Sequence, residues 1–110
     1  MSSIVTLKER KAHALARRKA AQARLEARLA AAAAQHGGCY RLYGSAARGA
    51  MRPDSDVDLL ADFPGHSISA AIRAAEDACE ELGLACDIVD QAWCSETFLQ
   101  RVLPGAKVLA

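Results

Sequence analysis

The stretch of sequence that decides the fold reads Gly44-Ser-Ala-Ala-Arg-Gly-Ala-Met-Arg-Pro-Asp-Ser-Asp-Val-Asp58. It lies between two short apolar segments, residues 39–43 and residues 57–63, which are typical of buried strands. Asp56 and Asp58 stand two residues apart where the second segment begins, so a strand would project both carboxylates from the same face. We therefore expect two strands joined by a polar loop, with paired carboxylates at the start of the second strand.

Two common ligand-binding loops are excluded for this stretch. A Walker phosphate loop requires Lys and then Ser or Thr after its second glycine, and neither follows Gly49. An EF-hand that began at Asp54 would require Gly at its sixth position and Glu at its twelfth, where this sequence has Leu59 and Gly65. The stretch therefore belongs to another kind of site.

The pair Asp56 and Asp58 is best explained by a divalent cation. Two carboxylates a few ångströms apart repel each other and raise each other's proton affinity, and a bound cation relieves this repulsion. Hard oxygen ligands select Mg²⁺ or Mn²⁺, and Mg²⁺ commonly takes substrate phosphate as a further ligand. An isolated Asp-x-Asp is also typical of a solvated strand edge, so the metal interpretation depends on what lies nearby.

Gly44 and Ser45 supply the complementary half, a site for an anion. We expect a short helix or turn over residues 46–51, so that backbone N–H groups, the Ser45 hydroxyl and a positive helix end face a phosphate. Arg48 and Arg52 are close enough in sequence to neutralise more of the phosphate charge.

The rest of the chain predicts alternating helices and strands. The expected elements are a helix over residues 69–82 ended by Gly83, a third strand over residues 84–89, and a helix over residues 96–103 that follows Ser95 as N-cap and ends at Pro104-Gly105. This order indicates an α/β or α+β fold, with helices packed on a sheet of three strands or slightly more.

The N-terminal region, residues 1–36, is an Ala-rich basic segment. Residues 6–35 contain no Gly or Pro, and Thr6 with Glu9 fits a capping box, so we expect a helix about 45 Å long that Gly37 ends. We expect its second half, around Leu25 and Leu29, to pack on the core and its first half to project. Lys11, Arg18 and Gln22 interrupt the apolar arc before Leu25.

Charge divides the chain in the same way. Residues 1–36 carry eight Lys or Arg against two Glu, a net charge of +6, whereas residues 37–110 carry six against eleven acidic residues, a net charge of −5. A basic stripe on the helix consists of Arg10, Arg17, Arg24 and Arg28. This stripe is a solvated helix face or a surface for a partner, and we rank a protein partner above RNA because aromatic residues are scarce there.

Four cysteines, Cys39, Cys79, Cys86 and Cys94, form no C-x-x-C pair, and we expect free, mostly buried thiols. No apolar run reaches the 18 residues of a membrane span, and the N-terminus lacks the pattern of a signal peptide. We therefore expect a soluble, cytoplasmic protein without a membrane partner.

The Gly-Ser pair, the next ten residues and the Asp-x-Asp pair together resemble the signature of the DNA polymerase beta-like nucleotidyltransferase superfamily. Residues 44–49 and 55–59 are similar to its minimal nucleotidyltransferase (MNT) branch, and the resemblance extends over about residues 25–109. It implies a nucleotidyltransferase-like core over residues 37–110. In that branch a third carboxylate lies on the next strand, and the matching residue here is Asp87, whereas Asp90 is interpreted as a capping or surface residue.

The resemblance implies transfer of AMP from ATP to a hydroxyl, with release of pyrophosphate. Asp56 and Asp58 would hold two Mg²⁺ ions, or Mn²⁺, and Asp87 would share the second ion or act as general base. The implied nucleotide-binding residues are Gly44, Ser45 and Arg48.

MNT proteins are commonly antitoxins of HEPN ribonuclease toxins, and some add AMP to a toxin tyrosine. The resemblance therefore implies a HEPN-type protein as partner and acceptor. Two alternatives are an antitoxin that neutralises its toxin by binding alone, and an enzyme that transfers the nucleotide to a small molecule. The small core and projecting helix are compatible with a homo-oligomer or a hetero-oligomer.

Overall fold

The computed structural model describes residues 6–49 and 55–110. Its elements are α1 (Leu7–His36), β1 (Cys39–Tyr43), β2 (Val57–Asp62), α2 (Ile68–Glu81), β3 (Cys86–Asp90), the 3₁₀ turn η1 (Gln91–Trp93), α3 (Glu96–Val102), the 3₁₀ turn η2 (Leu103–Gly105) and β4 (Lys107–Leu109).

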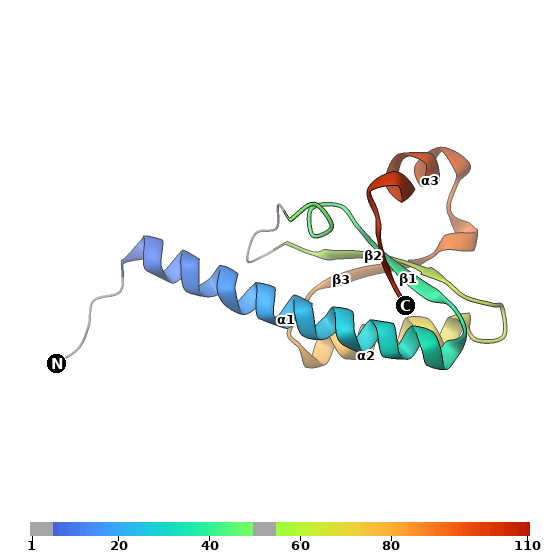
Figure 1. Cartoon of the computed structure of the whole chain (residues 1–110), viewed down its shortest axis with the longest axis horizontal. Coiled ribbons are helices and arrows are strands. Elements are labelled where there is room, and N and C mark those ends of the chain that lie inside the picture. Colours follow the sequence, from blue (N-terminus) through green and yellow to red (C-terminus); the bar gives the residue numbers. More distant parts are fainter. Residues whose placement is uncertain (1–5, 50–54) are drawn as a thin grey trace.

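The strands form a mixed four-stranded sheet in the order β3-β2-β1-β4. β1 pairs antiparallel with both β2 and β4, whereas β2 and β3 run parallel and are connected through α2. Figure 1 shows α1 and α2 below the strands and α3 on the other side of the sheet. This arrangement confirms the expected α+β fold of a small mixed sheet packed with helices.

The main core lies between the sheet and the helices α1 and α2. Leu25 and Leu29 of α1 are buried there, together with Val57 and Leu59 of β2. Tyr40 of β1 is also fully buried, and its hydroxyl donates a 2.6 Å hydrogen bond to a backbone carbonyl of α2. Alternate residues of β1 and β2 therefore face the two helices, which leaves the intervening residues for the other face of the sheet.

The ends of α1 follow the expected capping chemistry. Thr6 and Glu9 form the predicted capping box, with the Glu9 backbone N–H donating to the Thr6 hydroxyl at 3.1 Å. Gly37, with φ of 76°, ends the helix in the left-handed region that favours glycine. Although α1 has 30 residues, no helix within the described ranges is long and apolar enough to cross a membrane.

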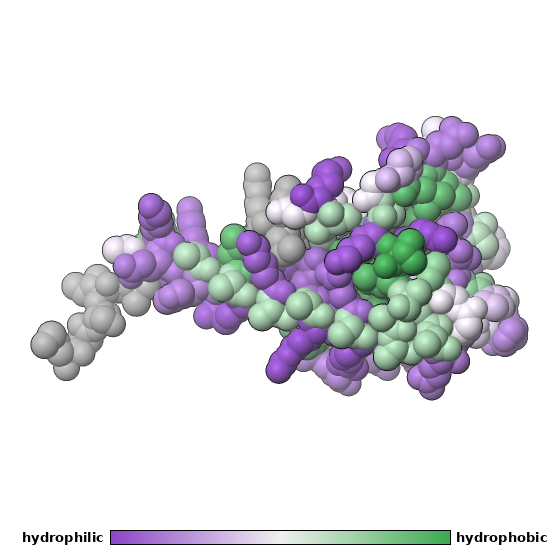
Figure 2. All heavy atoms as spheres, viewed as in Figure 1, coloured by the Kyte–Doolittle hydropathy of each residue, from purple (hydrophilic) through white to green (hydrophobic). Residues whose placement is uncertain are grey.

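The whole molecule measures 58 × 28 × 16 Å along its principal axes, and α1 extends beyond the rest of it. Figure 1 shows its first half projecting from the core, and Figure 2 shows many hydrophilic side chains over that half. Burial starts earlier than expected, because Arg18 and Gln22 are buried as well as Leu25 and Leu29. The two polar residues thus lie on the packed face instead of interrupting it.

The segment that follows β1 differs from a regular helix. Residues 44–49 form consecutive turns, with the Arg48 N–H donating to the Gly44 carbonyl and the Gly49 N–H donating to the Ala46 carbonyl. The last two residues of the expected helix or turn, 50 and 51, lie outside the described residues, as does Arg52. The turn alternative is confirmed for residues 46–49.

The expectation of four free cysteines is wrong for two of them. Cys79 of α2 and Cys86 of β3 form a disulfide, and their Cα atoms are 6.4 Å apart. α2 ends at a turn around Gly83, which directs the chain back along the helix and brings these residues within bonding distance. The spacing of seven residues does not by itself indicate a disulfide, because the two cysteines approach each other only through the turn between α2 and β3. Cys39 and Cys94 are free and only half-buried.

Candidate active site

A row of three side chains crosses the sheet on the face away from α1 and α2. Tyr43 of β1 lies opposite Asp58 of β2, and Asp58 lies opposite Asp87 of β3. Cross-strand partners share a face and have neighbouring Cβ atoms. The sheet therefore brings together Asp58 and Asp87, two of the predicted metal ligands, although a helix separates them in sequence.

The turn after β1 places backbone directly beside this row. Gly44 has φ of 74°, and a Cβ atom built on it would lie only 2.6 Å from Oδ2 of Asp58. A side chain at this position would therefore meet both backbone strain and the carboxylate. Glycine allows the predicted phosphate-binding turn and the predicted metal ligand to be in direct contact.

The charges of the row act on one another and on Tyr43. The pKa of Asp58 is raised above its ordinary value by burial, then by the charge of Asp87 and then by that of Asp56. Burial also raises the pKa of Tyr43, and the nearby charges of Asp58 and Asp87 raise it further. Asp58 is thus the centre of a cluster of negative charge, where a cation would be stabilised.

The donor set fits Mg²⁺ or Mn²⁺, because it consists of hard carboxylate oxygens whose mutual repulsion a cation would relieve. Asp58 is half-buried, whereas Asp56 and Asp87 are exposed and accessible to water and ligands. Within residues 6–49 and 55–110, the side chains of His, Cys, Asp and Glu form no group of three gathered closely enough to hold a metal ion. Mg²⁺ is commonly bound through one or two carboxylates, with water and substrate phosphate as its other ligands.

The predicted nucleotide-binding residues lie around the same turn. Ser45 directly follows Gly44 and is half-buried, whereas Arg48 is exposed at the surface of the turn. Asp90, predicted to be a capping residue, accepts a hydrogen bond from the Ala92 N–H at 3.0 Å and caps η1. Asp90, the last residue of β3, thus caps η1 and does not belong to the carboxylate row.

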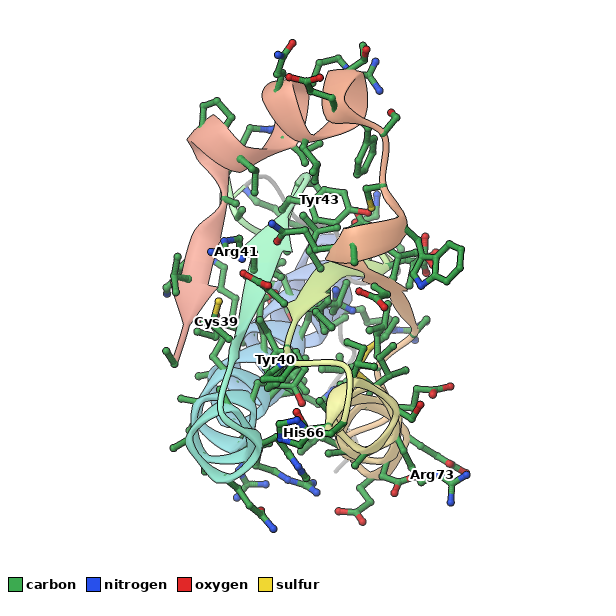
Figure 3. All side chains as sticks on the ribbon, turned by 90° about the vertical axis from the view of Figure 1, so that its right-hand side faces the viewer. Cys39, Tyr40, Arg41, Tyr43, His66 and Arg73 are labelled. Carbon is green, nitrogen blue, oxygen red and sulfur yellow. A yellow bond between two sulfur atoms is a disulfide. The ribbon has the colours of Figure 1, made fainter. Side chains whose placement is uncertain are left out.

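Tyr43 is the member of the row that sequence reasoning missed. Figure 3 shows Tyr43 on the α3 side of β1, whereas Tyr40 points towards α1 and α2. The Tyr43 ring contacts that of Phe98 edge to face, with centroids 5.7 Å apart. The strand alternation contained this signal, because a residue three positions after inward-facing Tyr40 must face outward beside Gly44.

Comparisons with known proteins identify the family of this chain. The family described as nucleotidyltransferase domain matches residues 34–104, which include the turn and all three carboxylates. A solved structure of a protein assigned as a minimal nucleotidyltransferase is similar to this chain, with 34% sequence identity and a TM-score of 0.66. The similarity covers 81% of this chain and 92% of that one. Comparison with curated proteins finds no match.

The chain therefore belongs to the nucleotidyltransferase domain family, and nucleotidyl transfer is its general activity. Within that family the minimal nucleotidyltransferases of the DNA polymerase beta-like superfamily are the group to which it is similar. The predicted family and fold class are thus confirmed.

Proposed function

We propose that this protein transfers AMP from ATP to a hydroxyl group of a partner protein. The observation that carries the proposal is the direct contact of the Gly44 backbone with the Asp58 carboxylate, which in turn lies in register with Asp87. A turn suited to phosphate and a pair of carboxylates suited to cations are thereby in contact. Nucleotidyl transfer requires both kinds of group around one triphosphate.

Asp56, Asp58 and Asp87 are the proposed ligands for two divalent cations. Such cations, when bound, neutralise phosphate charge and promote in-line attack at the α-phosphorus. The acceptor oxygen forms a bond to the α-phosphorus, the bond from that phosphorus to the bridging oxygen breaks, and pyrophosphate leaves. The acceptor proton passes to Asp87 or to water, for which the exposure of Asp87 is suitable.

The turn after β1 holds the triphosphate in this proposal. The Gly44 amide and the Ser45 hydroxyl donate hydrogen bonds to its terminal phosphates, and Arg48 stabilises the negative charge of the transition state. Arg48 is exposed at the surface of the turn, a position suited to this role. In this proposal the nucleotide passes directly to the acceptor, without a covalent intermediate on the chain. The residues therefore accelerate the transfer mainly by positioning the phosphate and the acceptor.

A protein acceptor is favoured by the position of Asp87. β3 is at one end of the sheet order, so Asp87 lies on an edge strand with its side chain exposed. A macromolecular hydroxyl can approach such a residue, whereas a small acceptor would need walls to hold it. Because the chain resembles MNT antitoxins, the partner we propose is a HEPN-type toxin, with this chain as its antitoxin.

The proposal is tested by incubating the purified protein with α-labelled ATP, Mg²⁺ and a co-expressed HEPN-type partner. The wild type should label the partner, and Asp58→Asn should abolish labelling while the two proteins still co-purify. Asp62→Asn is the matched control, because Asp62 is on the same strand but pairs with Arg41 at 2.8 Å, away from the row. Neutralisation that persists in Asp58→Asn without labelling would instead identify an antitoxin that acts by binding. Label on a small molecule alone would refute the protein acceptor.

A further inference from the structure

Arg18 of α1 is a buried residue, and two of its guanidinium nitrogens have no hydrogen-bond partner among the described residues. Its residue is only 6% exposed, and neither its Nε nor its Nη2 atom has a hydrogen-bond partner in the described part of the protein. A buried guanidinium that is not paired costs several kcal/mol of folding free energy, so such groups are normally neutralised by an anion. The proposed transfer reaction makes no use of this residue.

The surroundings of Arg18 form a cavity of about 360 Å³ between α1 and the turn from α2 to β3. Arg17 and Arg18 provide its positive charge, and its walls include Ala21, Leu82 and Leu84. Figure 1 shows that the end of α2 lies beside the middle of α1, where the projecting half begins. The cavity is therefore positively charged, has alanine and leucine side chains beside its two arginines, and adjoins the exposed part of the helix.

Two of the carboxylates near this region, those of Glu81 and Glu26, are engaged by other residues. Glu81, at the end of α2, pairs with Arg28 at 2.7 Å. Glu26 accepts from Lys107 at 2.6 Å and from the side-chain amide of Gln22 at 3.2 Å. Neutralisation of Arg18 by either would break an existing contact, so an external anion is the simpler partner.

We propose that this cavity binds a carboxylate side chain from an acidic segment of a partner protein. The methylene groups of a glutamate would lie against the alanine and leucine walls, and its two oxygens match the paired donors of a guanidinium. The C-terminal end of α2 carries negative dipole charge, which disfavours a doubly charged phosphate more than a carboxylate. The exposed Arg10, Arg17 and Arg24 would attract the rest of the acidic segment.

This inference goes beyond the proposed transfer reaction and does not depend on it. The cavity lies on the α1 and α2 side of the sheet, whereas the carboxylate row faces the other side. Loss of transfer in Asp58→Asn would leave binding at Arg18 intact, and loss of binding at Arg18 would leave the chemistry of the row intact.

The test measures binding of a capped hexaglutamate peptide to the full chain at constant ionic strength, by calorimetry and by the shift in melting temperature. Arg18→Met should weaken binding at least about tenfold, because it removes a charge-assisted hydrogen bond. Arg10→Met, on the exposed stripe, is the matched control and should weaken it far less. Equal affinity of Arg18→Met and the wild type would overturn the proposal.

A second variant keeps the test decisive if Arg18→Met fails to fold. Ala14→Glu adds a carboxylate one helical turn before Arg18, on the wall of the same cavity. It should raise the melting temperature and abolish peptide binding, because the site is then filled from within. Unchanged peptide binding in this variant would contradict the proposal. The proposal would also be overturned if inorganic phosphate bound more tightly than the peptide and the same variants lost that binding, because the cavity would then be a phosphate site.

Discussion

The backbone of Gly44 lies against the carboxylate of Asp58, so closely that a Cβ atom on Gly44 would be 2.6 Å from Oδ2. This contact joins the end of β1 to the start of β2 at the point where the two strands separate into the intervening loop. A substituent here would displace the carboxylate that the row of Tyr43, Asp58 and Asp87 depends on. The effect of this contact on activity can be separated from the effect of a substitution on the stability of the turn, by comparison with a second glycine of positive φ.

Gly44→Ala should lose most nucleotidyl transfer, whereas Gly49→Ala should retain most of it. Both glycines have positive φ, 74° and 71°, so alanine costs each about 1–2 kcal/mol of folding free energy. Nothing lies within 4 Å of a Cβ on Gly49, whereas a Cβ on Gly44 meets Asp58. Urea unfolding and a transfer assay on both variants make the comparison. Equal activity in the two would show that the contact with Asp58 does not matter.

Asp87→Asn should weaken binding of Mn²⁺ and reduce transfer on the order of 100-fold or more, the usual effect of removing a group that stabilises transition-state charge. Asp90→Asn, three residues further on, should leave both unchanged, because Asp90 caps η1. Paramagnetic relaxation of water gives the Mn²⁺ affinity of each variant. If only Asp90→Asn loses affinity for Mn²⁺, the metal ligand is Asp90 and not Asp87.

Tyr40 predicts a loss of stability in alkali. Burial raises the pKa of Tyr40 from 10.0 to about 12, so the folded state retains its proton more strongly than the unfolded state. The contribution of Tyr40 is therefore fully present below pH 10 and disappears as the pH rises towards 12. Tyr40→Phe should flatten this part of the curve of unfolding free energy against pH. An unchanged slope in the variant would assign the effect to other groups, of which Tyr43 is one.

The same variant should be less stable at neutral pH by about 1–2 kcal/mol, because the hydroxyl of Tyr40 no longer bonds the carbonyl of Ala71. Urea unfolding measures this loss, and Tyr43→Phe serves as the control because the structure shows no hydrogen bond from its hydroxyl to a described residue. An equal or larger loss in the control would show that the hydrogen bond to Ala71 does not account for the lower stability of Tyr40→Phe.

Reduction of the Cys79–Cys86 disulfide should lower the unfolding free energy by about 2 kcal/mol. The bond closes a short loop across the turn from α2 to β3, and the loss of loop entropy in the unfolded chain is correspondingly modest. Thermal unfolding with and without a dithiol reductant measures the effect, and Cys79→Ser should remove the response. A wild type that is indifferent to reductant would show that the two thiols are not bonded in solution.

The parts of the fold that were predictable from sequence depend on local chemistry. The ends of α1 follow from Thr6 and Gly37, and the start of α3 follows from Ser95, whose hydroxyl accepts from the Phe98 N–H at 3.1 Å. Alternation along the strand predicts the face that Asp58 occupies, whereas the assignment of Asp87 to the next strand as a further ligand comes from the family resemblance.

The features that were missed depend on packing between distant segments. Burial of Arg18 follows from the position of the α2–β3 turn against α1, which periodicity alone does not encode. The disulfide needs the same turn to bring Cys79 back to Cys86. The fourth strand, β4, pairs with β1 through only three residues, too few to give a clear pattern.

Because β2 and β3 are paired in parallel, the carboxylate row forms only when the chain has folded completely. Asp58 and Asp87 come from the two ends of a crossover through α2, and they meet only when that helix has docked and both strands are in register. A slip of one residue would turn Asp87 to the opposite face and place Cys86 or Ile88 beside Asp58. A partly folded chain would therefore be inactive, and it would bind metal only after α2 has docked and β2 and β3 have paired in register.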